Sequence, residues 1–278
     1  RMKRMTQTLL YKGDHINRAN VVWNIAGSFV YAFASMVLSF LVIRLAGEEQ
    51  GGIFSFGFST LGQQLFLVAY FGIRPFHITD GAGEYTFGDY REHRNITCLI
   101  ALAAGAVFMM IRHGAYLRGV GDYNGEKCTI LLLLVVYKVI DGYADVYESE
   151  FQRQGSLYLT GKSNFFRTIL SVSVFTVILA AFENLLLACL AAVAAQIGGV
   201  ILFNMDVIHA LSDVKWEVKK GQCRKLFLST GFLFVSVFLD FYIFSSAKYA
   251  IDARMNNAAS GYFNLIFMPT SVIYMVAN

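Results

Sequence analysis

The chain contains eight apolar stretches, and the longest of them could cross a membrane as helices. The first two, Ala19–Ile43 and Gly51–Ile73, run for 25 and 23 residues without a charged side chain. A bilayer core about 30 Å thick is crossed by roughly 20 apolar helical residues. The other six stretches are Asn95–Ile111, Cys128–Gly142, Thr168–Phe182, Asn184–Met205, Leu226–Ala247 and Ala258–Asn278. Because apolar and polar residues do not alternate within them, the pattern predicts membrane helices rather than the strands of a membrane barrel.

The composition supports the same fold class. Hydrophobic residues make up 56% of the 278 residues and charged residues 15%, with a mean hydropathy of +0.52, whereas soluble domains average about 45–50% and about 25%. We therefore predict an all-α integral membrane protein, a polytopic helical bundle. The four cysteines form no CxxC pair and the five histidines no HxxxH pair, so we expect no metal site and no cofactor.

Lysine and arginine are distributed unevenly between the two sides of this predicted bundle. With the N-terminus inside, the inner segments carry 16 of these residues and the outer loops carry 6. Because positive residues favour the cytoplasmic side, we expect a multi-pass protein with a cytoplasmic N-terminus. The loops are too short for a catalytic domain, and no P-loop, GxSxG or HExxH pattern is present. We therefore expect the activity to lie within the membrane and the protein not to be an enzyme.

A short motif occurs twice, and the second copy begins 209 residues after the first. Gly52–Phe58 (GIFSFGF) opens the second apolar stretch and Gly261–Phe267 (GYFNLIF) opens the eighth. This spacing predicts two parallel six-helix lobes related by an axis along the membrane normal, as in several transporter folds. The alternative is chance similarity between two aromatic helix starts. Because the chain starts at Arg1 instead of Met and ends at Asn278 within an apolar run, we expect it to be a piece of a longer protein.

The expected organisation has four parts. They are a cytoplasmic N-terminal segment (1–18), a complete six-helix lobe (19–208), a basic cytoplasmic linker (209–225) and the first two helices of a second, truncated lobe (226–278). The linker contains the basic run VKWEVKKGQCRK, which suits a surface of anionic lipid better than nucleic acid. We expect no nucleic-acid partner.

Four segments of the sequence resemble a known transporter family. They are residues 17–58, which begin NRANVVWNIAGSF, residues 70–94 (YFGIRPFHITDGAGEYTFGDYREHR), residues 145–167 (DVYESEFQRQGSLYLTGKSNFFR) and residues 247–269 (AKYAIDARMNNAASGYFNLIFMP). These segments are similar to the bacterial polysaccharide flippases of the multidrug/oligosaccharidyl-lipid/polysaccharide exporter superfamily.

The resemblance implies a transporter in the bacterial cytoplasmic membrane. Its substrate would be an oligosaccharide linked to polyprenyl pyrophosphate, moved from the inner to the outer face by alternating access for polysaccharide export. The resemblance also implies two six-helix lobes around a cavity lined by cationic residues. Membrane lipids, a polysaccharide polymerase and glycosyltransferases would be partners, and Na⁺ or H⁺ would be the coupling ion.

Charges inside the predicted spans are the first candidate site residues, because each costs about 2.5–3.5 kcal/mol to insert. Lys138, Asp141 and Asp145 lie on one helix face at i, i+3 and i+7. Lys138 and Asp141 form either a self-neutralising pair or a site in which Lys138 binds anionic substrate and Asp141 orients it or exchanges protons. Asp240 is the single charge in its stretch. It is either a hydrogen-bonded structural acid or the cation-coupling carboxylate that the resemblance implies for this helix.

Further candidates lie near the ends of the spans, since a pyrophosphate needs fixed cations. The cationic candidates are Arg18, Arg44, Arg74 and Lys248. Arg18 is preferred because it stands where the first span begins, although each of the four could instead anchor the chain at the lipid headgroups. Asn24 and Gln63 lie within the first two spans and bind either sugar hydroxyls or a neighbouring helix.

Two other functions stay open at this point. A cation-coupled multidrug exporter would favour more acids and aromatics and fewer cations in the cavity. An integral-membrane transferase acting on polyprenyl-phosphate sugars would need clustered Asp or His at a membrane face. The segment Arg74–Arg94 carries four acids but no DxD pair.

Overall fold

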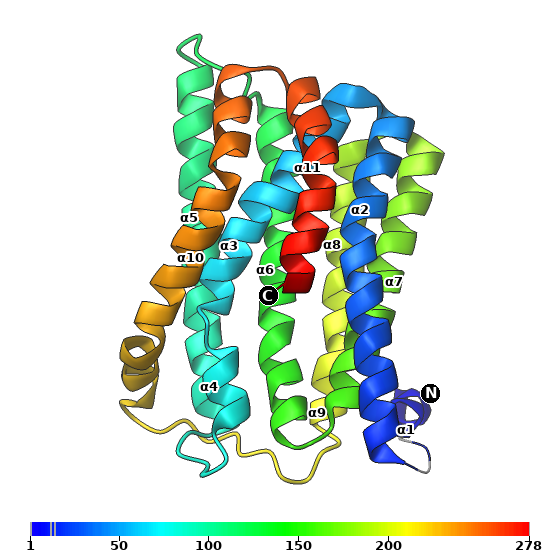
Figure 1. The fold of residues 1–278 in the computed structure, drawn as a ribbon, viewed down its shortest axis with the longest axis vertical. Helices are drawn as coiled ribbons and strands as arrows, with labels where there is room; N and C mark the ends of the chain where they lie inside the picture. Colours follow the sequence, from blue (N-terminus) through cyan, green and yellow to red (C-terminus); the bar gives the residue numbers. More distant parts are fainter. Residues whose placement is uncertain (1, 12, 14, 278) are drawn as a thin grey trace.

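Helices account for all the regular structure of residues 2–11, 13 and 15–277, which are the residues that the computed structural model describes (Figure 1). In chain order they are α1 (Met2–Leu10), α2 (Ile16–Phe56), the π-helix η1 (Gly57–Leu61), α3 (Gly62–Tyr70), α4 (Arg74–Thr79), α5 (Phe87–Tyr116), α6 (Gly125–Arg153), α7 (Leu157–Phe182), α8 (Leu185–Val200), the π-helix η2 (Ile201–Met205), α9 (Asp206–Ile208), α10 (Gln222–Arg254) and α11 (Asn257–Ala277). For these residues the predicted all-α class is confirmed.

Several of these helices have the length and surface of membrane spans. Five segments of the described chain are long and apolar enough to cross a membrane: Ile16–Thr79, Phe87–Tyr116, Leu157–Phe182, Leu185–Ile208 and Gln222–Arg254. Large apolar side chains such as Phe232 and Ile243 of α10 are exposed on the outside of the bundle. Soluble monomers rarely expose extended apolar patches, so these are the features of a multi-pass membrane protein.

The first two predicted spans are joined by a reversal at Gly47. This residue has φ 89° and ψ 171° within an otherwise helical run, a conformation that is essentially restricted to glycine. Residues 16–46 run in one direction, and residues 48–56 return through η1 and α3 (Figure 1). A side chain on Gly51 would overlap that of Ile43, because the two arms lie so close. The reversal therefore needs one non-helical residue rather than a loop.

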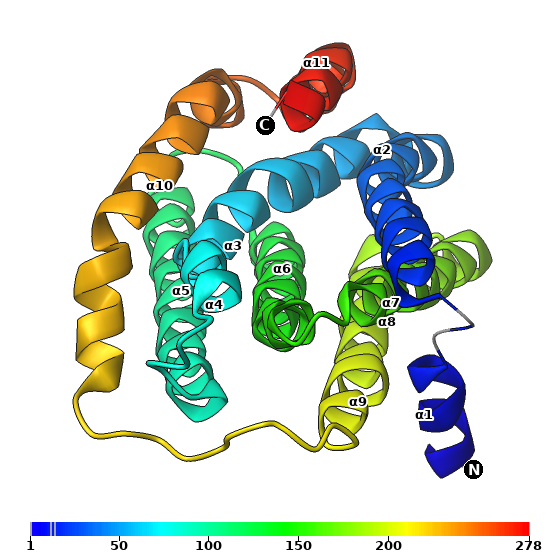
Figure 2. The ribbon, with the colours of Figure 1, turned by 60° about the horizontal axis from the view of Figure 1, so that its bottom comes forward.

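α6 runs through the middle of the bundle, where it contacts α2, α3, α4, α5, α7 and α8 (Figure 2). It begins after Asn124, whose side chain accepts the backbone N–H of Lys127, as expected of an N-cap. Most of the charged residues of α6 are buried against neighbouring helices, among them Lys138, Asp141 and Glu148. Charges within a span are tolerated where they face the bundle interior, which explains why the helix richest in internal charges is the central one.

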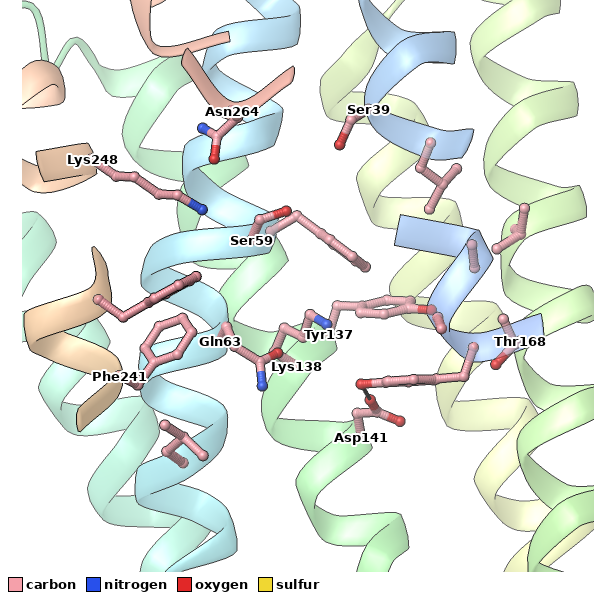
Figure 3. A pocket seen from close by; sticks show the side chains of 18 of the residues that line it. Ser39, Ser59, Gln63, Tyr137, Lys138, Asp141, Thr168, Phe241, Lys248 and Asn264 are labelled. Atoms are coloured by element: carbon pink, nitrogen blue, oxygen red, sulfur yellow. Dashed lines mark hydrogen bonds between the residues drawn. The ribbon is translucent and has the colours of Figure 1, made fainter. Parts of the chain in front are cut away.

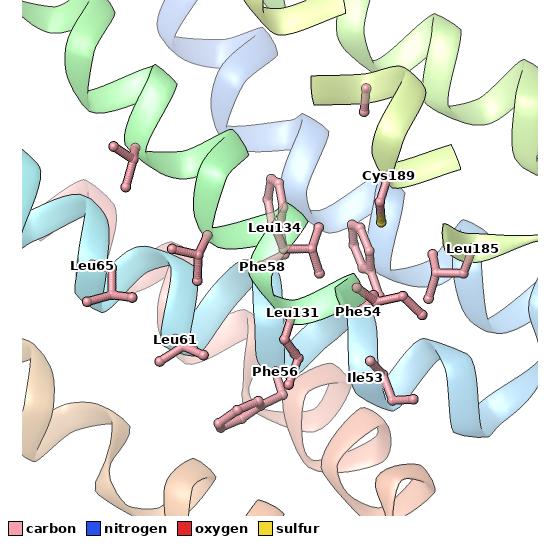
Figure 4. Close-up of a cluster of buried hydrophobic side chains, with 14 of the residues drawn as sticks. Ile53, Phe54, Phe56, Phe58, Leu61, Leu65, Leu131, Leu134, Leu185 and Cys189 are labelled. Carbon is pink, nitrogen blue, oxygen red and sulfur yellow. The ribbon is translucent and has the colours of Figure 1, made fainter. Parts of the chain in front are cut away.

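Apolar packing joins α6 to the helices around it (Figure 4). Phe54 and Phe58 stack with their ring centres 5.3 Å apart, and both are buried with Leu131 and Leu134 of α6. Cys189 of α8 lies in the same cluster and is a free thiol. The cysteine thus acts as a small apolar core residue.

α2 and α7 approach each other through glycines. A Cβ added at Gly27 would overlap the carbonyl oxygen of Gly161, and one added at Gly161 would overlap the backbone of Trp23. Such small residues let two helix backbones come into direct contact.

Residues 209–221 connect α9 to α10 along one end of the bundle, which we call the linker end (Figure 2). The opposite end, where the chain reverses at Gly47, we call the Gly47 end. Here Asp252 of α10 accepts a hydrogen bond from Tyr123 and lies 3.3 Å from Lys127 and 3.4 Å from Arg112. These contacts fasten α10 to the ends of α5 and α6.

The two copies of the sequence motif also meet at the Gly47 end. A Cβ added at Gly261, where the second copy begins, would lie 3.2 Å from the Cα of Gly52, where the first copy begins. The predicted parallel lobes stay a prediction, but the two motifs do face each other.

Candidate substrate cavity

A cavity of about 410 Å³ lies between the α10–α11 pair and the earlier helices. Its walls come from α2, η1, α3, α6, α7, α8, α10 and α11. Sites for small molecules usually enclose about 300–1,000 Å³. The cavity therefore has room for a polar head group rather than for a whole lipid.

Two lysines point into this cavity, Lys138 from α6 and Lys248 from α10 (Figure 3). Their exposed fractions are 4% and 5%. The Lys138 Nζ lies 4.0 Å from the centre of the Phe58 ring, and the Lys248 Nζ lies 5.2 Å from that of Phe267. Within the described chain, neither ammonium group has a carboxylate oxygen within ion-pair distance. An aromatic face stabilises a cation by about 0.5–2 kcal/mol, so both groups keep most of their capacity to bind an anion.

Asp141 lines the same cavity but does not pair with Lys138. Its Oδ1 lies 2.8 Å from Nη1 of Arg167 and accepts a hydrogen bond from Gln196 at 3.3 Å. Its Oδ2 accepts a hydrogen bond from the Tyr31 hydroxyl at 2.6 Å. The i, i+3 pair that the sequence allows is therefore not formed, because partners from α2, α7 and α8 surround the carboxylate.

A network of buried ion pairs continues from Asp141 toward the linker end. Arg167 also lies 3.0 Å from the Glu148 carboxylate. One turn from Glu148, Asp145 lies 2.8 Å from Arg94 and 2.6 Å from Arg74. Asp141, Asp145 and Glu148 thus each have an arginine partner, which is the arrangement that offsets the cost of burying charge.

The predicted site residues divide into two groups. Those that line the cavity are Lys138, Asp141, Asp240 and Gln63, together with Lys248. Those that lie outside it are Arg18, Arg44, Arg74 and Asn24. Arg18 and Arg44 are exposed on α2, and Arg74 is engaged by Asp145 and by the Gln152 side chain at 2.9 Å. Arg74 thus forms an ion pair with Asp145 and does not line the cavity.

The sequence analysis misses Arg167, which does not line the cavity but lies 2.8 Å from the cavity residue Asp141. The predicted span begins at Thr168, one residue after Arg167, so the sequence places Arg167 in the flanking loop. The sequence feature that could have indicated a cation here is on α6, where Asp141 and Glu148 are seven residues apart on one helix face. Two acids buried on one face of a span require a cation nearby.

The rest of the wall mixes hydroxyl, amide and aromatic side chains (Figure 3). The polar ones are Ser39, Ser59, Gln63, Thr168, Gln196 and Asn264, and the aromatic ones are Tyr31, Phe58, Tyr137, Phe241 and Phe244. Phe58 and Ser59 come from the π-helix η1, a distortion that is frequent at functional sites. Amides and hydroxyls can exchange hydrogen bonds with sugar hydroxyls, and the rings offer flat apolar faces.

Fold and cavity together define an all-helical, membrane-compatible protein with an internal polar site that carries two lysines. No protein-family model, curated protein or solved structure matches the chain. The functional assignment therefore depends on the cavity itself.

Proposed function

We propose that this protein carries a phosphorylated lipid across the membrane, and that the cargo is an oligosaccharide linked to polyprenyl pyrophosphate. The observation that carries the proposal is the pair of lysines in the cavity. Lys138 and Lys248 are buried and, within the described chain, face aromatic rings instead of carboxylates. A buried charge is costly unless it is compensated. A pyrophosphate would supply the missing negative charge, and its bonds to ammonium groups would be charge-assisted.

The rest of the wall suits the sugars next to the phosphate. Gln63 and Asn264 offer amide groups, and Phe241 offers a ring face in the same cavity. The polyprenyl chain would stay in the bilayer. No covalent bond is made or broken in this process. The protein would act by binding the cargo and by changing the side of the membrane from which the cavity is accessible.

The contacts at the Gly47 end are the ones that a change in the accessible side of the cavity would have to break. Asp252 ties α10 to α5 and α6 through Arg112 and Lys127, and Gly52 packs against Gly261. Separation of these contacts would open the Gly47 end. Alternating access would therefore require the α10–α11 pair to move relative to α2, α5 and α6.

Transport in proteoliposomes tests the proposal. The cargo is a fluorescent polyprenyl-pyrophosphate disaccharide, and a membrane-impermeant quencher reports its arrival in the outer leaflet. We expect the intact protein to accelerate flipping and Lys138→Gln and Lys248→Gln each to lower the rate by about tenfold, because each removes one charge-assisted contact. Arg118→Gln, which removes an exposed cation outside the cavity, should leave the rate unchanged. Equal rates in all four proteins would contradict the proposal.

A cation-coupled multidrug exporter is the second candidate, favoured by the acid Asp240 and the aromatic rings in the cavity wall. The same vesicles distinguish the two functions. Uptake of tetraphenylphosphonium without flipping of the disaccharide lipid would favour the exporter.

A further inference from the structure

We infer that Arg167 is a positioning residue for substrate binding: by engaging Asp141, it keeps the Lys138 ammonium available for the anionic group of the substrate. The inference rests on the proposed function. It names the residue that keeps the Lys138 ammonium of the same cavity free of an ion pair with Asp141.

Asp141 would otherwise be the natural partner of Lys138. The two residues are one helical turn apart on α6, a spacing at which Lys and Asp side chains pair readily. In the structure the Asp141 carboxylate instead lies 2.8 Å from Arg167 and accepts hydrogen bonds from Tyr31 and Gln196. Its oxygens are therefore occupied.

Arg167 is well suited to this role because it is itself fixed on two sides. Its Nη1 faces Asp141 and its Nη2 lies 3.0 Å from Glu148, so the planar guanidinium bridges two carboxylates of α6. Its side chain is almost completely buried. It is not among the residues that line the cavity, so it would act on the substrate only through Asp141 and Lys138.

Two glycines leave room for this arrangement. A Cβ added at Gly199 of α8 would lie 2.8 Å from Cγ of Arg167. A Cβ added at Gly62 of α3 would lie 3.0 Å from Cγ of Lys138. The neighbouring Gly198 has open space around it and gives a matched control on the same helix.

Binding of farnesyl pyrophosphate to the intact protein in lipid nanodiscs tests the inference. In Arg167→Gln the Asp141 carboxylate loses its positive partner and competes for Lys138, so we expect about tenfold weaker binding. In Asp141→Asn/Arg167→Gln the competing charge is absent, and we expect binding within about threefold of the unmodified protein. A double variant as weak as Arg167→Gln alone would overturn the inference, because it would show that Arg167 acts through packing.

Substitutions at Asp141 and at two glycines keep the test decisive if Arg167→Gln does not fold. Asp141→Asn leaves Arg167 in place, and we expect it to bind the pyrophosphate at least as tightly as the unmodified protein; clearly weaker binding would overturn the inference. Gly199→Ala should displace Arg167 and weaken binding, and Asp141→Asn should restore it. Gly198→Ala should have no effect, and equal effects of the two glycine substitutions would contradict the inference.

A structure of Arg167→Gln separates this inference from the proposed function, because it needs no ligand. Lys138 Nζ within ion-pair distance of Asp141 would support the inference, and Lys138 still against the Phe58 ring would overturn it. If that pair forms but the unmodified protein does not bind farnesyl pyrophosphate, the proposed function fails while the positioning role of Arg167 stands.

Discussion

The positive charge of the cavity comes from Lys138 and Lys248, each of which contacts aromatic rings. Lys138 lies against Phe58 and Tyr31, and Lys248 lies against Phe244 and Phe267. Aromatic faces tolerate a cation without neutralising it. At the scale of residues, the cavity is therefore prepared for an anion.

Asp240 is the other acid of the cavity wall, and it differs from Asp141 in its surroundings. Asp141 is buried and held by Arg167, whereas the Asp240 residue is exposed. Asp240 is thus better placed to exchange an ion with water in the cavity. We predict that Asp240→Asn removes the dependence of transport on an imposed H⁺ or Na⁺ gradient, because an amide can neither take up a proton nor bind Na⁺ as a carboxylate does.

Flipping rates with and without each gradient check this prediction. Asp213→Asn, an exposed acid of the linker, serves as the control and should keep the gradient dependence. Unchanged dependence in Asp240→Asn would show that this carboxylate does not couple transport to an ion.

At the scale of elements, the glycine contact between α2 and α7 sets how closely these two helices pack. We predict that Gly161→Ala destabilises the protein by about 1–3 kcal/mol, because the new methyl group would overlap the backbone of Trp23 and force the helices apart. Gly198→Ala adds the same methyl group where nothing lies within 4 Å, so its effect should stay within about 1 kcal/mol.

Thermal unfolding of both variants in detergent measures the difference. A clearly lower midpoint for Gly161→Ala than for Gly198→Ala is the expected result. The same midpoint for both would mean that the α2–α7 contact can relax without cost.

The positions of the helices could be predicted from the sequence much better than their ends. Within the described residues, all eight apolar stretches fall on helices except for residues 71–73 at the end of the second and residue 184 at the start of the sixth, because a mainly apolar run of that length has few other stable conformations in a membrane. α6 is longer than its predicted stretch: it extends from Gly125 to Arg153, whereas the apolar run covers only Cys128–Gly142. The extension contains Asp145 and Glu148, whose partners come from distant helices.

The cavity residues could be predicted from the sequence only where a polar or charged side chain interrupts an apolar stretch of one helix. Lys138 and Asp141 stand out as charges in an apolar stretch, and both line the cavity. The choice of partner for Asp141 depends on α7, which no local sequence window contains. For the same reason the sequence could not show that Arg74 is engaged by Asp145 of α6.

At the scale of the whole molecule, the cavity lies where the α10–α11 pair meets the first helices. At the Gly47 end, Asp252 fastens this pair to α5 and α6, and the Gly52–Gly261 contact joins it to α2. Elsewhere α10 exposes a broad apolar surface that includes Phe232 and Ile243. A polar site enclosed by helices with apolar outer faces is the arrangement that a carrier of an amphiphilic lipid needs.

The central claim is that the head group of a phosphorylated lipid enters this cavity, and site-specific photocrosslinking tests it most directly. The photoreactive residue benzoylphenylalanine replaces Phe241, which lines the cavity, or Phe232, which is 91% exposed on the outside of α10. The probe is a farnesyl-pyrophosphate disaccharide with a radiolabel in the sugar. We predict that position 241 is labelled more strongly than position 232 and that Lys138→Gln lowers the labelling at 241 by about tenfold. Labelling at 241 that is no stronger than at 232, or that is undiminished in Lys138→Gln, would contradict the claim.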